Sequence, residues 1–475
     1  MNTALTRRGL LGGAAAMGLG ATAAVTGPPA AATTPAGHPV ANGRLPARSE
    51  FVVRNAYVVS MDPVIGDLSD ADVHVRGGEI VAVGRHLKTR CTQLDGSGTV
   101  VMPGLIDTHW HLWTSLYRSM SSSSPETAYF ALNLRNGAKA LPSDLFQGAR
   151  LGLADALNTG ITTVHDWSHN LISPAHVDAN LHAHQEVGLR GRFSYGTRQG
   201  QPATELLNLD DVRRVKREWF DSGRLPLLKL GLAGRPPGIA PESTFRPEYD
   251  AARSLGLPVS YHVNSTRAQG ALQMIAQLGA QSMLGPQTQL IHALYTSAAE
   301  RAAVKESGAS ISISPWSELL IGYGVSPVQE LATSGVLLNL SVDTLPLTGS
   351  ADLWSIMRLV AGLARGQAEQ EFALSTRRVL QMATLDAARG LGLGDVTGSL
   401  TPGKRADLIM VDIQDVNTAP FTDPANTLAL AASPTNVDTV VVDGRILKRH
   451  GRLTALDVDQ VVRETSRALK ALLAR

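Results

Sequence analysis

The chain has 475 residues, enough for more than one domain at roughly 150 residues each. Hydrophobic residues make up 44% of it and charged residues 18%, which excludes an intrinsically disordered chain. The single cysteine, Cys91, excludes an intramolecular disulfide framework and a cysteine-rich zinc module. A formal charge of +2, from 43 basic and 41 acidic side chains, is too small for a nucleic-acid-binding or polybasic membrane-binding surface.

Residues 1–32 are typical of a secretory signal peptide of the twin-arginine type. Arg7 and Arg8 are the only charged residues there, and a Gly/Ala-rich run and Ala30-Ala31-Ala32 follow them. Glycines dilute this run, so it is less apolar than the ~20-residue span of a membrane anchor. We expect export to the periplasm or the extracellular space, with residues 33–48 as a linker. The remaining chain has 41 basic and 41 acidic groups, so the excess charge belongs to the signal.

Short β-rich runs lie on both flanks of the rest of the chain. Gly77-Gly78 and Asp443-Gly444 separate such runs, and both pairs tolerate the positive φ of tight hairpin turns. We expect the flanks, 49–103 and 396–455, to form one composite β-sandwich domain. Residues 456–475 are expected to form a C-terminal helix.

Between the flanks, eight strand-like apolar runs alternate with helical stretches. The runs are Val100–Asp107, Ile161–Asp166, Gly191–Tyr195, Leu227–Leu232, Pro258–His262, Gln289–His292, Ser310–Ile313 and Val336–Ser341. This alternation predicts an α/β fold, a (β/α)8 TIM barrel over residues 104–395.

The first of these runs leads into the pair His109 and His111. Residues two apart on a strand point to the same side, so both imidazoles can face one metal ion. The pair also falls at the carboxyl end of its strand, where barrel enzymes have their sites. His182 and His184 have the same spacing but lie in a predicted helix, where such residues diverge by about 200°. We therefore expect that pair to be packing or surface residues.

Three more polar residues fall at the ends of later predicted strands. They are His262, His292 and Asp343. Because the carboxyl ends of barrel strands meet at one face, we expect these side chains to gather with the histidine pair.

On these residues the chain resembles the amidohydrolase superfamily of metal-dependent hydrolases. The resemblance covers about Phe51 to His450 and rests on the run Pro103–His111 and the three later strand-end residues. The run Gly398–Leu408 supports it, since it looks like the family's return into its small β-domain. The nearest branch is the cytosine-deaminase-like and triazine-hydrolase-like group, which works with one metal ion.

The resemblance implies a role for each of these residues. It implies that His109, His111, His262 and Asp343 hold one divalent metal ion, zinc by preference, with iron or manganese as alternatives. Such an ion lowers the pKa of a bound water to about 7. Asp343 and His292 are the implied catalytic residues: Asp343 transfers protons, and His292 orients the nucleophile or polarises the attacked bond.

One position departs from the family pattern. Deaminating members have a glutamate three residues after the strand 5 histidine, where this chain has Ser265. Serine does not supply a proton at neutral pH as a carboxylic acid does. This favours hydrolysis of an amide, cyclic amide or amidine C–N bond in a small cyclic or aromatic molecule. An aminohydrolase of a nucleobase- or triazine-like heterocycle is the alternative, and a catalytically silent metal- or ligand-binding protein is the alternative of another class.

Several loop residues are candidates for substrate contact. Trp110, Trp113 and Trp316, together with Trp167, follow predicted strands and suggest a π-stacking mouth for a planar substrate. The other candidates are His165, His169, Asn264, Ser265 and Arg118, the last as a partner for a substrate carboxylate.

Lys229 lies in the fourth predicted strand, where two-metal family members have a bridging lysine. It precedes the end of that strand at Gly234 by five residues, so we expect a single metal. We expect a small-molecule substrate, no nucleic acid and no stable membrane insertion; homo-oligomerisation is left open.

Overall fold

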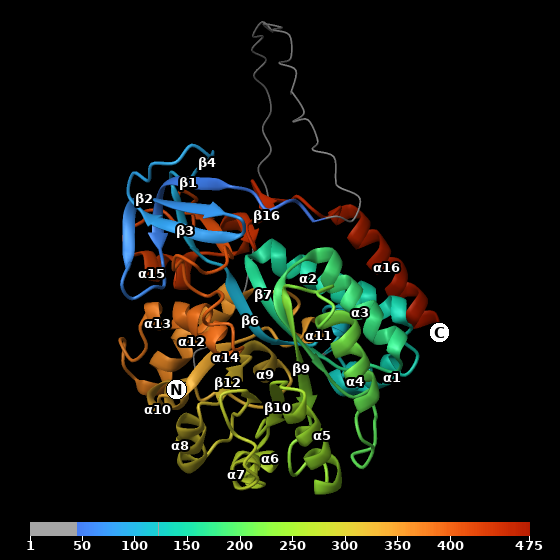
Figure 1. Ribbon diagram of the computed structural model, residues 1–475. Helices are drawn as coiled ribbons and strands as arrows, with labels where there is room; N and C mark the ends of the chain where they lie inside the picture. Colours follow the sequence, from blue (N-terminus) through green and yellow to red (C-terminus); the bar gives the residue numbers. More distant parts are fainter. Residues whose placement is uncertain (1–44, 122) are drawn as a thin grey trace, which may run out of the picture. The chain divides into compact units, whose positions relative to one another are not determined.

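The structure is a computed structural model that describes residues 45–121 and 123–475 (Figure 1). The predicted signal peptide, residues 1–32, and residues 33–44 of the predicted linker lie outside the described residues. In the part of the chain that is described, no helix is both long and apolar enough to cross a membrane.

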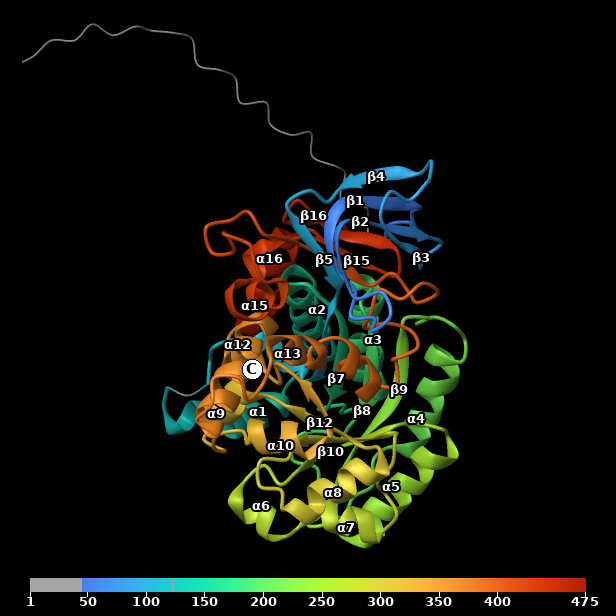
Figure 2. The same ribbon diagram turned by 90° about the vertical axis from the view of Figure 1, so that its left-hand side faces the viewer.

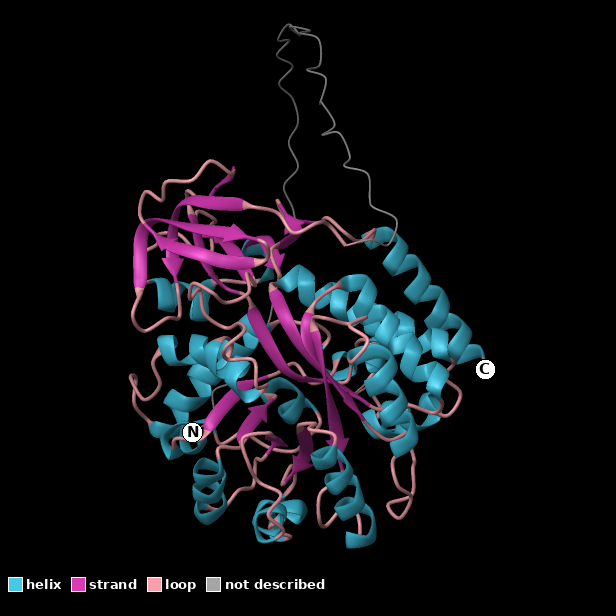
Figure 3. Ribbon diagram, viewed as in Figure 1, coloured by secondary structure: helices cyan, strands magenta, loops and turns pink. Residues whose placement is uncertain are grey.

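Eight parallel strands form a barrel and follow one another around it in chain order. They are β6 (Leu105–Trp110), β7 (Ile161–Ser168), β8 (Arg190–Tyr195), β9 (Leu228–Gly234), β10 (Val259–Val263), β11 (Thr288–His292), β12 (Ser310–Ile313) and β13 (Leu337–Leu340). Each contains or overlaps one of the apolar runs of the sequence, so the predicted TIM-barrel fold is confirmed. Helices surround these strands (Figure 3).

The first predicted strand, Val100–Asp107, requires a correction. The chain divides it at Gly104 between β5 (Thr99–Pro103), which belongs to another sheet, and β6 of the barrel. A Cβ atom at Gly104 would lie 2.2 Å from side-chain atoms of Thr162, so only glycine fits at this junction. The strand of the barrel therefore starts later and extends through His109.

Helices connect the strands of the barrel. Their bounds are α1 (Tyr129–Gly137), α2 (Pro142–Thr159), α3 (Pro174–Val187), α4 (Leu209–Val215), α5 (Glu242–Ser254), α6 (Arg267–Ala271), α7 (Met274–Ala280), α8 (Ala298–Ser307), α9 (Pro315–Leu320), α10 (Val328–Ser334), α11 (Leu345–Thr348), α12 (Leu353–Ala368), α13 (Thr376–Met382) and α14 (Leu385–Gly390), with short turns η1 (Leu112–Tyr117), η2 (Pro125–Thr127) and η3 (Lys216–Phe220). Local sequence explains several ends. For example, Ser297 and Glu300 form a capping box at the start of α8.

The barrel closes where its last strand returns to its first. Asp343, just after β13, bridges to Trp110 of β6. The backbone N–H of His111 donates to Asp343 O over 2.8 Å, and the N–H of Asp343 donates to His109 O over 3.0 Å. The carboxylate of Asp107 accepts from the N–H groups of His109 and Val342 and adds a further link between the two strands. Closure therefore occurs at the predicted site residues.

The two flanks of the chain build a separate nine-stranded sheet, in which strands from both ends lie side by side (Figure 2). It consists of β1 (Phe51–Val59), β2 (Asp67–Arg76), β3 (Glu79–Gly84), β4 (Thr92–Asp95), β5, β14 (Leu408–Asp412), β15 (Val437–Val442), β16 (Arg445–Arg449) and β17 (Arg452–Leu453). β5 pairs antiparallel with β14, so the flanks meet in the middle of the sheet. The sheet surrounds a hydrophobic cluster of its own that includes Phe51, Val73 and Leu408.

Three further helical elements and a last helix belong to the C-terminal part. They are α15 (Pro424–Asn426), η4 (Thr427–Ala431), η5 (Pro434–Asn436) and α16 (Val458–Ala474). The predicted C-terminal helix corresponds to α16, which packs against α2 of the barrel. Asp443 and Gly444, with φ of 53° and 73°, form the predicted turn between β15 and β16.

A buried ion-pair network joins the barrel to the small sheet. Arg190, the first residue of β8, donates from Nε to Asp407 Oδ2 over 2.5 Å and from Nη2 to Asp407 Oδ1 over 3.2 Å. Asp443 lies 3.5 Å from the same guanidinium. All three side chains are buried, so removal of Arg190 leaves the buried carboxylate of Asp407 without its cation.

We therefore expect Arg190→Met to lower the free energy of unfolding by about 3–5 kcal/mol, measured by urea denaturation. Arg213→Met is the matched control, because the Arg213–Asp210 pair is exposed and exposed pairs contribute about 0–1 kcal/mol. Equal stability losses in the two variants would contradict a stabilising role for the buried network.

Candidate functional site

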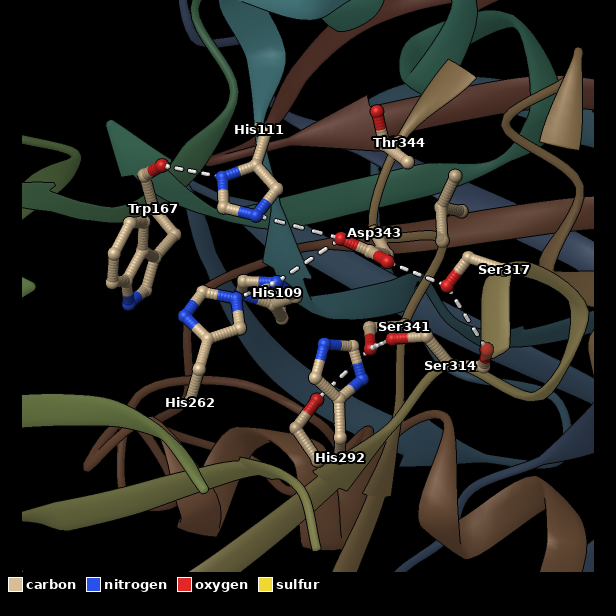
Figure 4. A network of polar contacts seen from close by, with 12 residues as sticks. His109, His111, Trp167, His262, His292, Ser314, Ser317, Ser341, Asp343 and Thr344 are labelled. Carbon is tan, nitrogen blue, oxygen red and sulfur yellow. Dashed lines mark hydrogen bonds and ion pairs between the residues drawn. The ribbon is translucent and has the colours of Figure 1, made fainter. Parts of the chain in front are cut away.

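Four of the predicted site residues converge at the carboxyl end of the barrel strands (Figure 4). His109 Nε2 lies 3.2 Å from Asp343 Oδ1, and His111 Nε2 lies 3.5 Å from the same oxygen. His262, from β10, brings its Nε2 to 3.2 Å from His109 Nε2. One donor atom of each histidine lies within 4.8 Å of the others. The spacing-based expectation that these side chains gather is met by the geometry.

His292 completes the group from the end of β11. It forms a second set with His109 and Asp343 whose donor atoms also lie within 4.8 Å of one another. His182 and His184 lie instead on α3, where the Nε2 of His184 is 3.2 Å from Asp166 Oδ2. This agrees with the expectation of packing residues for that pair.

The strand ends that carry the site have an unusual backbone. Asn264, His292 and Asp343 have φ of 47°, 71° and 67°, in the left-handed region that non-glycine residues rarely adopt. Such conformations cost on the order of 1–3 kcal/mol each and persist where surrounding structure enforces them. Of the three, His292 and Asp343 line the cavity, whereas Asn264 directly follows β10, the strand that carries His262.

Second hydrogen bonds orient two of the imidazoles. His111 Nδ1 donates to the carbonyl of Trp167 over 3.1 Å. His292 Nδ1 donates to Glu318 Oε1 over 3.1 Å. A donor role for Nδ1 leaves the Nε2 of His111 as the acceptor that faces the cluster.

Burial and mutual repulsion govern the charges of the histidines. Burial, followed by the neighbouring imidazoles, holds the pKa of His109 and of His262 well below the usual range. Burial also lowers the pKa of His111. Burial opposes the protonation of His292 too, but hydrogen bonding to Glu318 and the charge of Asp343 outweigh it and raise its pKa. Three imidazoles are therefore neutral at neutral pH and available as ligands.

This donor set fits a divalent metal ion. The Nε2 atoms of His109, which is completely buried, and of His262, which is partly buried, lie 3.2 Å apart. Two neutral nitrogens at this distance need either a shared proton or a cation between them. Three imidazoles and one carboxylate are ligands that zinc and related ions prefer.

Helix α9 supports both predicted catalytic residues from behind. Ser317 Oγ donates to Asp343 Oδ2 over 2.5 Å, which leaves Oδ1 directed toward the histidines. Glu318, completely buried, accepts from His292, from the backbone of Ser314 and from Ser326. Neighbouring residues of one helix thus fix the orientation of both side chains.

A cavity of about 280 Å³ opens over the cluster. Its aromatic and aliphatic lining includes Tyr129, Phe130, Trp167, Ile239, Ile321 and Tyr323, and its polar lining includes Asn133, His169, Gln199, Arg235, Ser265 and Gln269. Of the predicted substrate-contact residues, the cavity brings in His169 and Ser265. Apolar surfaces and polar groups that can orient a ligand are thus combined in its wall, as in small-molecule sites.

The predicted tryptophan mouth requires a correction. Trp167 lines the cavity, with its ring 4.4 Å from that of His262, centroid to centroid. Trp110 and Trp113 are buried in the hydrophobic core, and Trp113 reaches the cavity only through a hydrogen bond to His169. Trp316 is 38% exposed and lines another, shallower pocket with Arg358. Residues that directly follow different strands point in different directions, so position alone did not identify the lining.

Three other predicted substrate contacts also lie away from the cavity. His165 is buried beneath the cluster, where it contacts the Thr108 carbonyl and Ser194, and burial lowers its pKa to about 3. Arg118 forms an ion pair of 2.9 Å with Asp155 on the outside of the barrel, in a different pocket.

Asn264 is the third predicted substrate contact that lies away from the cavity. Its side chain forms hydrogen bonds within the protein. Its Nδ2 donates to Glu300 Oε1 over 3.1 Å, and its Oδ1 accepts from the N–H of Met274 over 3.2 Å. The side chain is fully buried. It fastens the end of β10 to α7 and α8.

Lys229 lies far from the metal-ligand cluster. Its side chain is exposed, and Nζ donates to the carbonyl of Gly392 over 2.9 Å. Gly234, at the end of the same strand, lines the cavity. The side chain of Lys229 therefore leaves the strand at the opposite side from the site, and it is unsuited to bridge a second metal there.

Several lining residues were not predicted from the sequence. Arg235 directly follows β9 and so had a positional signal, since it stands at a strand end like His262. Tyr129 and Tyr323 come from α1 and from the segment after α9. These residues reach the cavity only through tertiary packing, which a local sequence pattern does not predict.

Comparisons with known proteins agree with this fold. The model of the Amidohydrolase family matches residues 100–447. The chain is 28% identical to the 5'-deoxyadenosine deaminase of Methanosarcina mazei over 444 residues, 90% of this chain and 99% of that protein. A zinc-bound adenosine deaminase from Xanthomonas campestris superimposes with a TM-score of 0.81 at 24% identity, covering 90% of this chain and 99% of that one. A triazine hydrolase from Arthrobacter aurescens superimposes with a TM-score of 0.80 at 22% identity, covering 89% and 99%.

We expect Asn264→Ala to act on stability. Loss of two buried hydrogen bonds should lower the free energy of unfolding by about 1–3 kcal/mol, measured by chemical denaturation. Ser265→Ala is the matched neighbour, for which we expect a change within about 0.5 kcal/mol. Unchanged stability of Asn264→Ala would contradict this structural role.

Proposed function

Since the chain belongs to the amidohydrolase family, we propose that it is a metal-dependent hydrolase that uses water to break a C–N bond, other than a peptide bond, in a small cyclic or aromatic molecule. The observation that carries the proposal is the convergence of His109, His111, His262 and Asp343 at one end of the barrel. The zinc in the solved adenosine deaminase of the same fold supports a divalent metal in this place.

In this proposal His109, His111, His262 and Asp343 hold one divalent ion, with zinc preferred to iron or manganese. Such an ion supplies Lewis acidity that makes a water molecule nucleophilic near neutral pH. The neutral state of the three imidazoles, enforced by burial, keeps their nitrogens available as ligands.

Asp343 and His292 carry the proton transfers and the polarisation of the substrate. Asp343 accepts a proton from the attacking water and delivers it to the leaving group, while Ser317 keeps one of its oxygens in place. His292 lines the cavity with Nδ1 anchored on Glu318, so its other ring nitrogen faces the substrate. From there it stabilises the negative charge that develops on the attacked C=O or C=N group.

The lining favours a neutral, flat substrate of about nucleoside size. Trp167, Tyr129 and Tyr323 offer aromatic surfaces beside the cluster. Arg235 reaches the cavity, but its guanidinium already pairs with the buried carboxylate of Glu248. The Arg235 guanidinium is therefore already neutralised by a protein carboxylate.

The leading reaction is hydrolysis of an amide, a cyclic amide or an amidine, because Ser265 stands where deaminases of this branch have a glutamate. Of the described residues that line the cavity, Asp343 alone is a carboxylate. Deamination of a nucleoside-like heterocycle is the second candidate. It is favoured by the likeness to the 5'-deoxyadenosine deaminase, which extends over 90% of the chain.

Metal removal provides one test. We expect a chelator to abolish turnover, and added zinc to restore it with one equivalent bound at the site of His109.

Asp343→Asn should lower kcat by about 10²–10⁴-fold without loss of folding, because it removes the proton-transferring group. Trp316→Ala is the control, since this side chain lies in another pocket. Unchanged turnover in Asp343→Asn would contradict the proposed mechanism.

Ammonia release from a nucleoside separates deamination from ring opening of a cyclic amide, because ring opening keeps the nitrogen in the product. A panel of cyclic amides, amidines and adenosine-type nucleosides is offered to the zinc-loaded protein, and free ammonia is measured with a coupled enzyme assay. We expect ring opening of a cyclic amide without ammonia. Stoichiometric ammonia from a nucleoside would establish the deaminase, and no turnover on the whole panel would favour a binding protein.

We also propose export by the twin-arginine route. This proposal rests on the sequence of residues 1–32 alone. Replacement of both Arg7 and Arg8 by lysine should retain the full chain in the cytoplasm, because the exporter reads the arginine pair. Cell fractionation of the two forms measures this. Export of the lysine form at the original level would refute the route.

A further inference from the structure

The small sheet carries a second group of metal-ligating side chains, which the proposed function does not use. Glu50 directly precedes β1, His74 lies in β2 and Cys91 directly precedes β4. In the sheet register, Val52 pairs with His74 across β1 and β2, and Phe51 pairs with Thr92 across β1 and β4. The three side chains therefore come from three neighbouring strands, with β1 in the middle. We call them the outer cluster.

The donor atoms of the outer cluster are close together. One donor atom of each residue lies within 4.8 Å of the other two, and His74 Nε2 is 3.0 Å from Glu50 Oε1. A tetrahedral zinc ion with bonds of about 2.0–2.3 Å separates its ligands by about 3.3–3.8 Å. The side chain of Glu50 is 43% exposed and that of His74 only 12%. The 3.0 Å between His74 and Glu50 is slightly shorter than this spacing, and a small rotation of the more exposed Glu50 carboxylate reaches it.

The hydroxyl of Thr89 contacts both the sulfur and the backbone of Cys91. Its Oγ1 accepts from the N–H of Cys91 over 3.4 Å and lies 3.0 Å from Cys91 Sγ. Because the hydroxyl accepts from the backbone, its own hydrogen is free to be donated to the sulfur. A hydrogen bond donated to sulfur stabilises the thiolate, which is the form that binds metals.

We propose that Glu50, His74 and Cys91 form a second divalent-metal site that binds zinc, with water at the fourth position. Thiolate, imidazole and carboxylate together suit zinc rather than magnesium or calcium, which prefer oxygen ligands alone. The ion fastens β4 to β1 and β2. β4 has four residues, and β1 is its pairing partner among the described strands. Binding to the folded state alone stabilises this edge of the sheet.

Cobalt substitution of the full chain tests the site. Cys91 is the only cysteine, so a thiolate-to-cobalt charge-transfer absorption in the near ultraviolet can arise only at the outer cluster. We expect this absorption and two equivalents of cobalt in the wild-type protein. Cys91→Ser should lose the absorption and one equivalent, yet keep hydrolytic activity. Its melting temperature should rise less on metal addition than that of the wild type.

Further variants make the outcome independent of the catalytic centre. His109→Ala should lose the catalytic ion but keep the charge-transfer absorption. Loss of metal at one site is thus measured independently of the other site. His74→Ala and Glu50→Ala should each weaken cobalt binding at the sulfur by at least tenfold. Absence of the absorption in the wild type would overturn the proposal. Its full persistence in both His74→Ala and Glu50→Ala would also overturn it, because the thiolate would then bind cobalt without the cluster.

Discussion

Two backbone hydrogen bonds, from His111 to Asp343 and from Asp343 to His109, close the barrel and fix its candidate metal ligands at the same time. The first and last strands meet through the residues that supply an imidazole pair and a carboxylate. Their relative positions are therefore set by strand pairing and only secondarily by side-chain rotamers. The Asp107 carboxylate, bonded to both sides of this seam, holds it together from within the barrel. A site built on rigid strands keeps its geometry better than one built on loops.

His109, at this seam, also lies close to the imidazole of His262 from β10. The Nε2 atoms of His109 and His262 lie 3.2 Å apart, which requires a cation between them or a proton shared by them. Helix α9 restrains the two predicted catalytic residues, Asp343 through Ser317 and His292 through Glu318. Strained φ values at His292 and Asp343 belong to the same arrangement. The local backbone cost is compensated by the packing of the whole barrel.

The sequence carried enough information for the barrel and for the gathering of His109, His111, His262 and Asp343 at one end of it, because both follow from apolar runs and from positions at strand ends. Apolar runs gave the strands, and spacing placed His109 and His111 on one side of the first. Prediction from the sequence failed where tertiary packing determines the structure. The run from Val100 to Asp107 has one strand propensity throughout, and only the contact of Gly104 with Thr162 divides it between two sheets. In the same way, Glu318 and Ser317 have no strand-end signal, and their roles come from how α9 packs.

The pairing of β5 with β14 has a consequence for how the molecule assembles. The two strands are about 300 residues apart in the chain, yet they form the central pair of the small sheet. During synthesis, β5 presents an unpaired edge until β14 has left the ribosome, and such an edge invites pairing with other chains. Contacts between residues this distant also slow folding. The sheet that begins the described chain is thus completed only after the entire barrel has been made.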